Sequence, residues 1–163
     1  MSKNLEQISL SLGRIPSGLF IVTFFNKELN QPDGMLVSWV QQSSFEPPMI
    51  SFAIKKGRKA LELIEDAQSF VVNVMGKENA KIIGSFYKGV GADKFVGLNT
   101  SETTHSKVPI LSNSVSYLEC ELKHVADFGG DHVLVFGEVV EGNLLNADQN
   151  EPSTHLRKNG FDY

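Results

Sequence analysis

Four basic residues lie within five positions of an otherwise acidic chain. The stretch is Lys-Lys-Gly-Arg-Lys at 55–59, and the formal net charge of the sequence is −4. It follows an apolar run at 49–54 and precedes apolar residues at helical spacing, so the cations would lie between a strand and a helix N-terminus. Free backbone N–H groups at a helix N-terminus attract anions, so this pattern fits a phosphate site. A solvated basic turn would have the same sequence, and the residues alone leave both interpretations open.

Familiar catalytic patterns are not found elsewhere in the sequence. The stretch 89–94 begins like a dinucleotide fingerprint, but Lys94 replaces its third glycine and no strand-to-helix unit surrounds it. There is no Walker loop, no G-x-S-x-G elbow and no H-E-x-x-H motif. The sequence has four histidines, His105, His124, His132 and His155. Their spacing is not typical of metal ligands, so we expect no metal site. We also expect no catalytic side chain, so if the protein is an enzyme, an organic cofactor would carry out the chemical step.

The composition is that of an ordinary globular protein. Apolar residues make up 41% of the 163 residues and charged residues 21%. One short basic stretch cannot supply many phosphate contacts, so nucleic acid is not expected as a partner. No apolar run reaches the length of a membrane span, and the first residues lack the apolar core of a signal peptide. With Cys120 as the one cysteine, we expect a cytoplasmic protein with a single domain over 1–163 and no membrane partner.

Strand patterns dominate the chain. We expect strands near 18–24, 35–41, 49–54, 70–75, 118–123 and 132–140, and short helices near 4–12, 60–67 and 78–87. Pro32-Asp33-Gly34 indicates a turn, and 88–108 a long surface excursion. Because strands and helices do not alternate regularly, the pattern predicts a mostly β protein with an antiparallel barrel rather than a doubly wound sheet.

Two of the predicted strands differ in how their faces would be covered. The stretch 118–123 alternates, which places Cys120 toward the core and Glu119 on a face toward water. The stretch 132–140 has apolar residues at both odd and even positions. Such a strand needs cover on both faces, so we expect the core on one side and a second subunit of a homodimer on the other.

Residues 34–48, GMLVSWVQQSSFEPP, resemble the signature of the flavin reductase-like family, the FMN-binding split barrels. That signature runs roughly Gly, x, Thr, x, Ser, small, apolar, then a Ser shortly before Pro-Pro. Further matches follow in the family's order: FVVNVM at 70–75, Phe86, PIL at 109–111, LEC at 118–120, GDH at 130–132 and GEV at 137–139. The segments 13–20 and 155–160 are similar to the flavin reductase module of cyanobacterial diflavin flavoproteins.

The resemblance implies a six-stranded antiparallel split barrel with short flanking helices, which dimerises and holds FMN near the subunit interface. The residues that would line the flavin are Ser38, Trp39, Val40 and Gln41, and those that would hold its phosphate are Lys55, Lys56, Gly57 and Arg58. Phe86 would contact the cofactor, and His132 lies where the nicotinamide of the family's co-substrate approaches. The sequence departs from the family at Leu36 and Gln42, where Thr and Ser are common.

The resemblance therefore implies an NAD(P)H-dependent flavin reductase, an oxidoreductase that passes hydride from nicotinamide C4 to flavin N5. NADH or NADPH would be the co-substrate, and an electron-acceptor protein a further partner. Two alternatives stay open: an FMN-binding electron carrier without direct NAD(P)H activity, and a non-enzymatic split-barrel module. At the level of residues, Trp39 and Phe86 also fit core packing, Gln41 an exposed strand end, and His132 an exposed turn.

Overall fold

The chain, as a computed structural model, folds around one curled antiparallel sheet, and the structure describes residues 3–87, 89–90, 92–148 and 150–162. Seven strands follow the order β2-β1-β5-β8-β9-β4-β3 in this sheet, and a smaller sheet pairs β6 with β7. The bounds of the strands are β1 Phe20–Asn26, β2 Gln31–Val37, β3 Val40–Ser44, β4 Met49–Lys55, β5 Ser69–Val74, β6 Thr100–Glu102, β7 Pro109–Leu111, β8 Ser116–Asp127 and β9 His132–Leu144.

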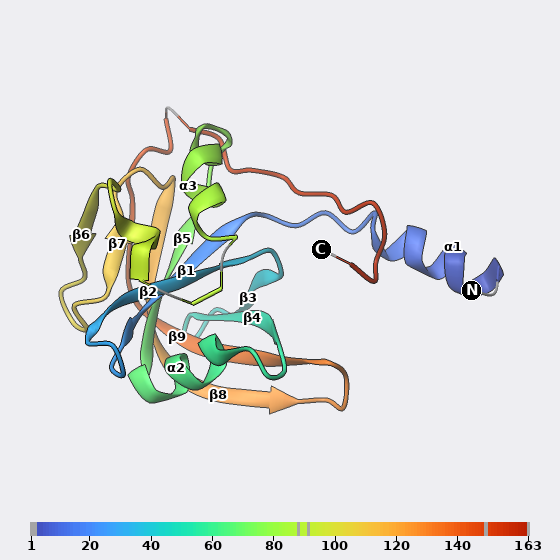
Figure 1. The fold of residues 1–163 in the computed structure, drawn as a ribbon, viewed down its shortest axis with the longest axis horizontal. Helices are drawn as coiled ribbons and strands as arrows, with labels where there is room; N and C mark the ends of the chain where they lie inside the picture. Colours follow the sequence, from blue (N-terminus) through green and yellow to red (C-terminus); the bar gives the residue numbers. More distant parts are fainter. Residues whose placement is uncertain (1–2, 88, 91, 149, 163) are drawn as a thin grey trace.

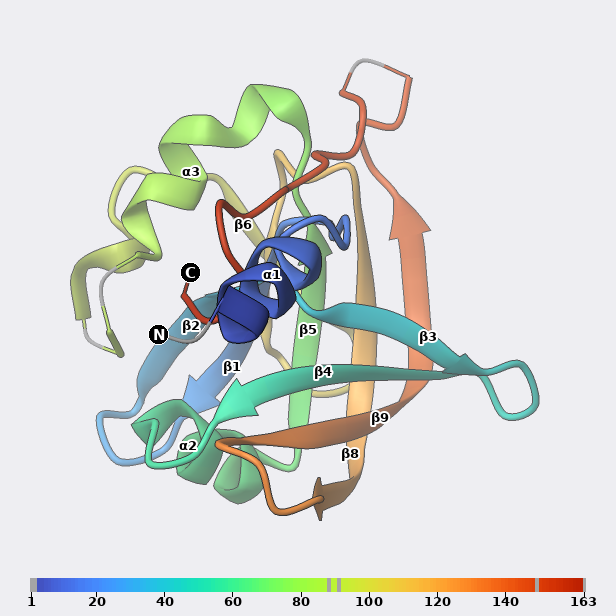
Figure 2. The same cartoon turned by 90° about the vertical axis from the view of Figure 1, so that its right-hand side faces the viewer.

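The long strands β8 and β9 fold the sheet over on itself. Residues 132–138 of β9 pair with β4 on one side, while β9 pairs with β8 along the other side. Register shifts at Glu119/Cys120 and Leu122/His124 mark bulges, which bend a strand and increase its twist. As a result β4 and β9 cross over β5 and β8 in Figure 2, and β2 comes into contact with β4 without a ladder between them. This confirms the expected mostly β split barrel, although the main sheet has seven strands rather than six.

The core fills the space inside the curled sheet. Phe52 of β4 and Phe70 of β5 meet edge to face, with ring centroids 5.3 Å apart, and both rings are fully buried. Opposite them, Gly137 of β9 leaves room for the Phe70 ring, because a Cβ at this position would lie 2.5 Å from that ring. The bulky residues of two strands thus meet against a glycine on a third.

Short helices flank the barrel. Their bounds are α1 Lys3–Leu12, α2 Lys59–Ala67 and α3 Ala80–Ser85, with 3-10 turns η1 Lys77–Asn79 and η2 Ala92–Phe95. Helix α2 buries Ala60, Leu63 and Ile64 and contacts β1 and β5. In Figure 1, α1 projects from one side of the barrel and leaves Leu5 and Ile8 exposed. None of the helices in the described residues is long and apolar enough to cross a membrane.

The C-terminal segment 150–162 returns along the link between α1 and β1 (Figure 1). The backbone groups of Ser17 and His155 exchange two hydrogen bonds of 3.0 and 2.7 Å. Farther on, the amide of Gly160 donates to the carbonyl of Ser9 at 2.6 Å. These contacts carry the histidine and the nearby Arg157 toward the seam where β2 faces β4.

Two sequence predictions at the seam are wrong. Pro32-Asp33-Gly34 is not a turn but part of β2, and the turn lies at 27–30, where Asn30 has φ 52°. Because β2 is an edge strand, Pro32 can lack its N–H without breaking a second ladder. The predicted continuous strand 35–41 is also interrupted, because Ser38 and Trp39 form the bend between β2 and β3.

Candidate functional site

A cavity of about 620 Å³ lies at the seam of the barrel. Its walls come from the end of β2, the end of β4, the start of α2 and the chain just after α3, with one residue from the C-terminal segment. An open seam between two strands that share no ladder leaves room for a ligand that a closed barrel would fill with side chains. The fold therefore places the cavity where the basic turn at 55–59 meets the bend at Ser38.

One end of the cavity is the N-terminus of α2. Gly57 has φ +76°, a left-handed conformation that glycine adopts without strain and that lets the chain turn sharply from β4 into the helix. Arg58 is the N-cap residue and makes no side-chain capping hydrogen bond. The first-turn N–H groups of a helix have no partner within the helix, and Lys59 and Ala60 of this turn line the cavity. This end offers both backbone donors and positive charge to an anion.

The basic residues of this turn do not all face the cavity. Lys59 donates hydrogen bonds to Glu28 at 2.6 Å and to Glu62 at 2.9 Å, and these bonds raise its pKa. Lys56 points away and forms an ion pair with Asp127 of β8 at 2.7 Å. Arg58, by contrast, has no ion pair within the described residues. Arg58 and Lys55 are therefore the cations of the cavity that are least engaged with carboxylates.

The other end of the cavity is aromatic. Trp39 is 36% exposed, and two groups contact its ring. The ring centroid of His132 lies 5.1 Å from that of Trp39, and the guanidinium carbon of Arg157 lies 4.8 Å from the Trp39 centroid. A cation this close to an indole face is attracted by the ring quadrupole. Phe86 is buried and meets Phe95 edge to face at 5.4 Å. Trp39 is thus an exposed wall of the cavity, whereas Phe86 is both core and wall.

The structure brings six of the ten sequence-predicted site residues together. The residues that line the cavity are Ser38, Trp39, Lys55, Gly57, Arg58 and Phe86. The other four, Val40, Gln41, Lys56 and His132, are not in its described lining. Gln41 and its neighbour Gln42 are exposed on the edge strand β3, and the His132 ring contacts Trp39 of the cavity wall. A binding role for all ten residues stays a prediction.

Two contributors were missed by the sequence reasoning. His155 lines the cavity from the C-terminal segment and is 116 positions from Trp39 (155 − 39). The segment 155–160 resembles the family module, but that resemblance gave His155 no role in binding. Lys94 lies behind Phe86, with its Nζ 6.0 Å from the ring centroid and 2.9 Å from Asp33 Oδ1. In the sequence, Lys94 was noted only because it replaces the third glycine of a fingerprint, and a lysine in the predicted surface excursion 88–108 gives no signal of a buried partner.

The comparisons with known proteins agree with this geometry. Residues 12–161 match the flavin reductase like domain, and the chain belongs to that family. It is 35% identical to diflavin flavoprotein A 1 of Synechocystis sp. over 161 residues, which are 97% of this chain and 27% of that protein. Putative diflavin flavoprotein A 6 of Nostoc sp. is also 35% identical, over 98% of this chain and 27% of its own length. The chain thus spans about a quarter of the curated relatives it matches.

Solved structures share the fold along most of the chain. Nitrilotriacetate monooxygenase component B from Mycobacterium thermoresistibile superposes with a TM-score of 0.82 at 25% identity, over 91% of this chain and 80% of that chain. The flavin reductase HpaC, solved with NADP+, gives a TM-score of 0.79 at 27% identity, over 97% and 95% of the two chains.

Proposed function

We propose that this chain is an NAD(P)H-dependent flavin reductase that binds FMN in the seam cavity. The observation that carries the proposal is the pairing of an aromatic wall with an uncapped helix N-terminus in one cavity. FMN has the same two parts, a flat aromatic ring system and a phosphate dianion. Family membership and the likeness to flavin reductases support the same activity.

The residues of the cavity fit this cofactor in size and charge. A volume of about 620 Å³ lies within the range of about 300–1,000 Å³ that is usual for ligand pockets. Arg58 can make charge-assisted, bidentate hydrogen bonds to phosphate oxygens, beside the backbone N–H groups of Lys59 and Ala60 in the first turn of α2. The FMN phosphate would therefore lie at the 57–60 turn, and its ring near Trp39 and Phe86. We propose FMN rather than a cofactor without a phosphate for this reason.

The protein's part in hydride transfer would be alignment. When bound, the flavin supplies an N5 atom that accepts hydride from nicotinamide. Trp39 would hold the rim of the cavity in one orientation, because His132 and Arg157 contact its ring. His132 itself is held by Asp131, whose Oδ1 lies 2.8 Å from its Nδ1. We propose that this rim orients the nicotinamide of NADH or NADPH, since correct placement of two reactants lowers the barrier without a catalytic nucleophile.

We further propose that residues 1–163 form one domain and act in the cytoplasm as a homodimer. Support for pairing comes from α1, which leaves Leu5, Ile8 and Leu12 exposed on a projecting helix. In β9, Leu134 and Phe136 are only half buried, on the face opposite the core residues Val133 and Val135. A second copy could cover these apolar groups. Light scattering behind size exclusion would give the mass of a dimer, and a monomer that is saturated with FMN would contradict the proposal.

One observation favours a second candidate function. The chain spans 27% of the length of its diflavin relatives, so there the matching part is one module among others. An electron carrier that receives electrons from a protein donor, and passes them from bound FMN to an acceptor protein, would use the same cavity. It would differ from a reductase in its slow reaction with NAD(P)H.

A titration and a reduction assay separate these functions. Trp39 is the one tryptophan of the sequence and lines the cavity, so bound FMN should quench its fluorescence. The FMN-loaded protein is then mixed anaerobically with NADH or NADPH, and bleaching of the visible flavin absorbance is followed. Rapid bleaching supports the reductase. Saturable quenching of Trp39 by FMN without bleaching by NAD(P)H would instead support the electron-carrier function. If FMN does not quench Trp39, the protein is a split-barrel module that binds no FMN.

A further inference from the structure

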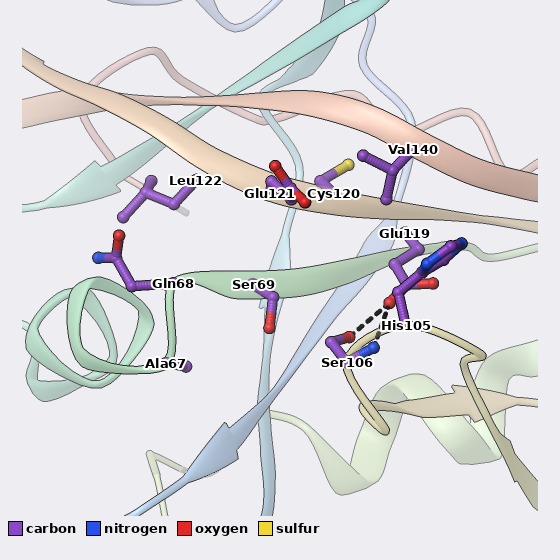
Figure 3. Close-up of a pocket in the computed structure, with 10 residues that line it drawn as sticks. All are labelled: Ala67, Gln68, Ser69, His105, Ser106, Glu119, Cys120, Glu121, Leu122 and Val140. Atoms are coloured by element: carbon purple, nitrogen blue, oxygen red, sulfur yellow. Dashed lines mark hydrogen bonds between the residues drawn. The ribbon is translucent and has the colours of Figure 1, made fainter.

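A second cavity, of about 330 Å³, shares no described lining residue with the seam cavity. It lies between the start of β5, the middle of β8 and the loop that joins β6 to β7 (Figure 3). His105 and Ser106 of that loop lie together with Glu119 at one end of the cavity, away from Gln68 and Leu122. The sequence predicted that Glu119 faces water, but its side chain is on this buried surface and is only 1% exposed.

The bulged strand β8 places a second carboxylate beside the first. Glu119 and Glu141 are cross-strand partners in the β8–β9 ladder, directly before the register shift at Cys120. Like charges directly opposite each other destabilise an antiparallel pair. Ligand atoms of Glu119, Glu141 and His105 all lie within 4.8 Å of one another, and His105 Nε2 is 3.6 Å from Glu141 Oε2. Among the described residues, His105 is the one basic side chain paired with either carboxylate.

One carboxylate oxygen of this cluster accepts no hydrogen bond from the described residues. Ser106 donates from its backbone N–H at 2.9 Å and from its Oγ at 2.5 Å, and both bonds go to Oε1 of Glu119. Oε2 of Glu119 is buried and has no hydrogen-bond partner within the part of the chain that the structure describes. In Figure 3 the dashed bonds from Ser106 end on one carboxylate oxygen, while the His105 ring lies beside the other. A buried carboxylate oxygen without a donor is costly unless a cation is bound to it.

The second carboxylate is held in the same manner. The Tyr117 hydroxyl donates to Glu141 Oε1 at 2.5 Å, the Thr104 side chain also hydrogen-bonds this carboxylate, and Oε2 lies 3.6 Å from His105 Nε2. Each carboxylate is therefore held by donors from outside the cluster and lies near the imidazole. Metal-binding carboxylates commonly have this arrangement, because outer hydrogen bonds orient the ligands.

We propose that His105, Glu119 and Glu141 bind one divalent transition-metal ion, with Zn²⁺ as the preferred ion. A set of one imidazole nitrogen and two carboxylate oxygens suits borderline cations, and zinc binds such donors more tightly than manganese or iron(II). Zinc–nitrogen and zinc–oxygen bonds are about 2.0–2.2 Å long, so the ligand atoms would close in slightly from their present separations. His105 can make this movement because 61% of its side chain is exposed. Three protein ligands leave a position for water.

The proposed ion would tie the β6–β7 loop to the β8–β9 ribbon. The ligands come from three segments that are distant in the sequence, which explains why the spacing of histidines alone predicted no metal. The role is structural, since this cavity is separate from the one proposed for FMN. Zinc should therefore stabilise the fold without changing the affinity for flavin.

Calorimetric titration of chelator-treated full-length protein with Zn²⁺ tests the site. We expect one ion per chain and a thermal unfolding midpoint raised by about 2 °C or more at saturating zinc. Tyr117→Phe, which removes a donor to a ligand, should weaken zinc binding by about tenfold or more. His105→Ala should weaken it further. His124→Ala is the matched control, because this histidine is also exposed and lies on the same strand as Glu119. It should bind zinc as the wild type does.

Two further readouts keep the proposal open to refutation. Cobalt(II) in place of zinc should give visible absorption bands that disappear in His105→Ala, while Trp39 quenching by FMN stays unchanged in that variant. Glu119→Gln preserves the shape of the side chain, and circular dichroism before titration will show whether it folds. The proposal is overturned if the wild type takes up no zinc, or if His105→Ala binds zinc and cobalt as tightly as the wild type.

Discussion

Lys94 Nζ lies 2.9 Å from Asp33 Oδ1, and neither side chain is more than 3% exposed. The same Nζ donates to the carbonyl of Gly34 at 2.6 Å, while Asp33 Oδ2 accepts from the Asn26 amide at 3.3 Å. This pair joins η2 to β2 directly behind Phe86, the buried ring that lines the seam cavity. The pair therefore fixes the back of the proposed flavin site.

The Lys94→Met variant should be strongly destabilised. It leaves the Asp33 carboxylate buried without its cation, and breaking one side of a buried pair typically costs about 3–5 kcal/mol. Urea unfolding followed by circular dichroism measures this loss. Lys81→Met on the exposed side of α3 is the control and should change the free energy of unfolding by less than about 0.5 kcal/mol. A Lys94→Met protein as stable as this control would show that the pair does not hold the wall.

The Arg58→Gln variant should bind FMN about tenfold or more weakly, because a charge-assisted hydrogen bond to phosphate contributes about 1.5–3 kcal/mol. Its affinity for riboflavin, which has no phosphate, should change little. Lys56→Gln, two positions before Arg58, is the matched control, since Lys56 is paired with Asp127 and is not in the described lining of the cavity. Trp39 quenching gives all the affinities. Equal losses for both flavins in Arg58→Gln would place the phosphate elsewhere.

Local pattern was enough to predict most strands and the basic turn. The alternation and apolar runs of β4, β5, β8 and β9 show in the sequence because each strand buries at least one face. The Gly57 turn is also visible locally, since a strand pattern stops and a helical pattern starts around it. These features depend on neighbours in the sequence, which periodicity can detect.

Features that depend on distant partners were predicted wrongly or missed. Pro32-Asp33-Gly34 resembles a turn, yet Asp33 is drawn into a strand by a lysine 61 positions away. The alternation of residues in β8 predicts that Glu119 faces water, yet the 103–108 loop folds over it and Ser106 donates a hydrogen bond to it. His155 reaches the cavity only because the C-terminal segment pairs with Ser17. No local propensity encodes such contacts.

The Gly137→Ala variant tests how tightly the barrel is packed. A Cβ here would lie 2.5 Å from Phe70 Cζ and 3.0 Å from Cys120 Cβ, so the core must shift. Overpacking of this kind costs about 1–3 kcal/mol. In the described structure, Gly84→Ala in α3 would meet nothing within 4 Å and serves as the control, with an expected change near zero or a small gain. Thermal unfolding of both variants measures the difference, and equal stabilities would mean that the barrel interior yields easily at β9.

The Cys120 thiol should be unreactive in the folded protein. Burial raises its pKa from 9.0 to about 12. Below a pH of about 12 the neutral thiol therefore predominates, and the neutral thiol is a poor nucleophile. Because the folded pKa is the higher one, the thiol's contribution to stability is present below pH 9.0 and is lost as the pH rises toward about 12. Labelling with a disulfide reagent near neutral pH should be slow until denaturant is added. Rapid stoichiometric labelling of the native protein would contradict this burial.

The His132→Ala variant tests the proposed reductase at its rim. His132 packs on Trp39 with ring centroids 5.1 Å apart, but it is not in the described lining of the seam cavity. Its removal should therefore leave FMN affinity nearly unchanged and loosen the indole that we propose to orient nicotinamide. Anaerobic stopped-flow reduction by NAD(P)H should slow by about tenfold or more, the scale of one positioning contact.

His124→Ala, an exposed histidine on β8, is the control for this experiment and should reduce at the wild-type rate. The two variants are compared at equal flavin loading, so that a lower occupancy cannot imitate a slower reaction. If His132→Ala lowers FMN occupancy and stability together, the histidine holds the fold rather than the nicotinamide. A wild-type rate of hydride transfer in His132→Ala would remove the residue from the site, since an orienting contact cannot be lost without a change in rate.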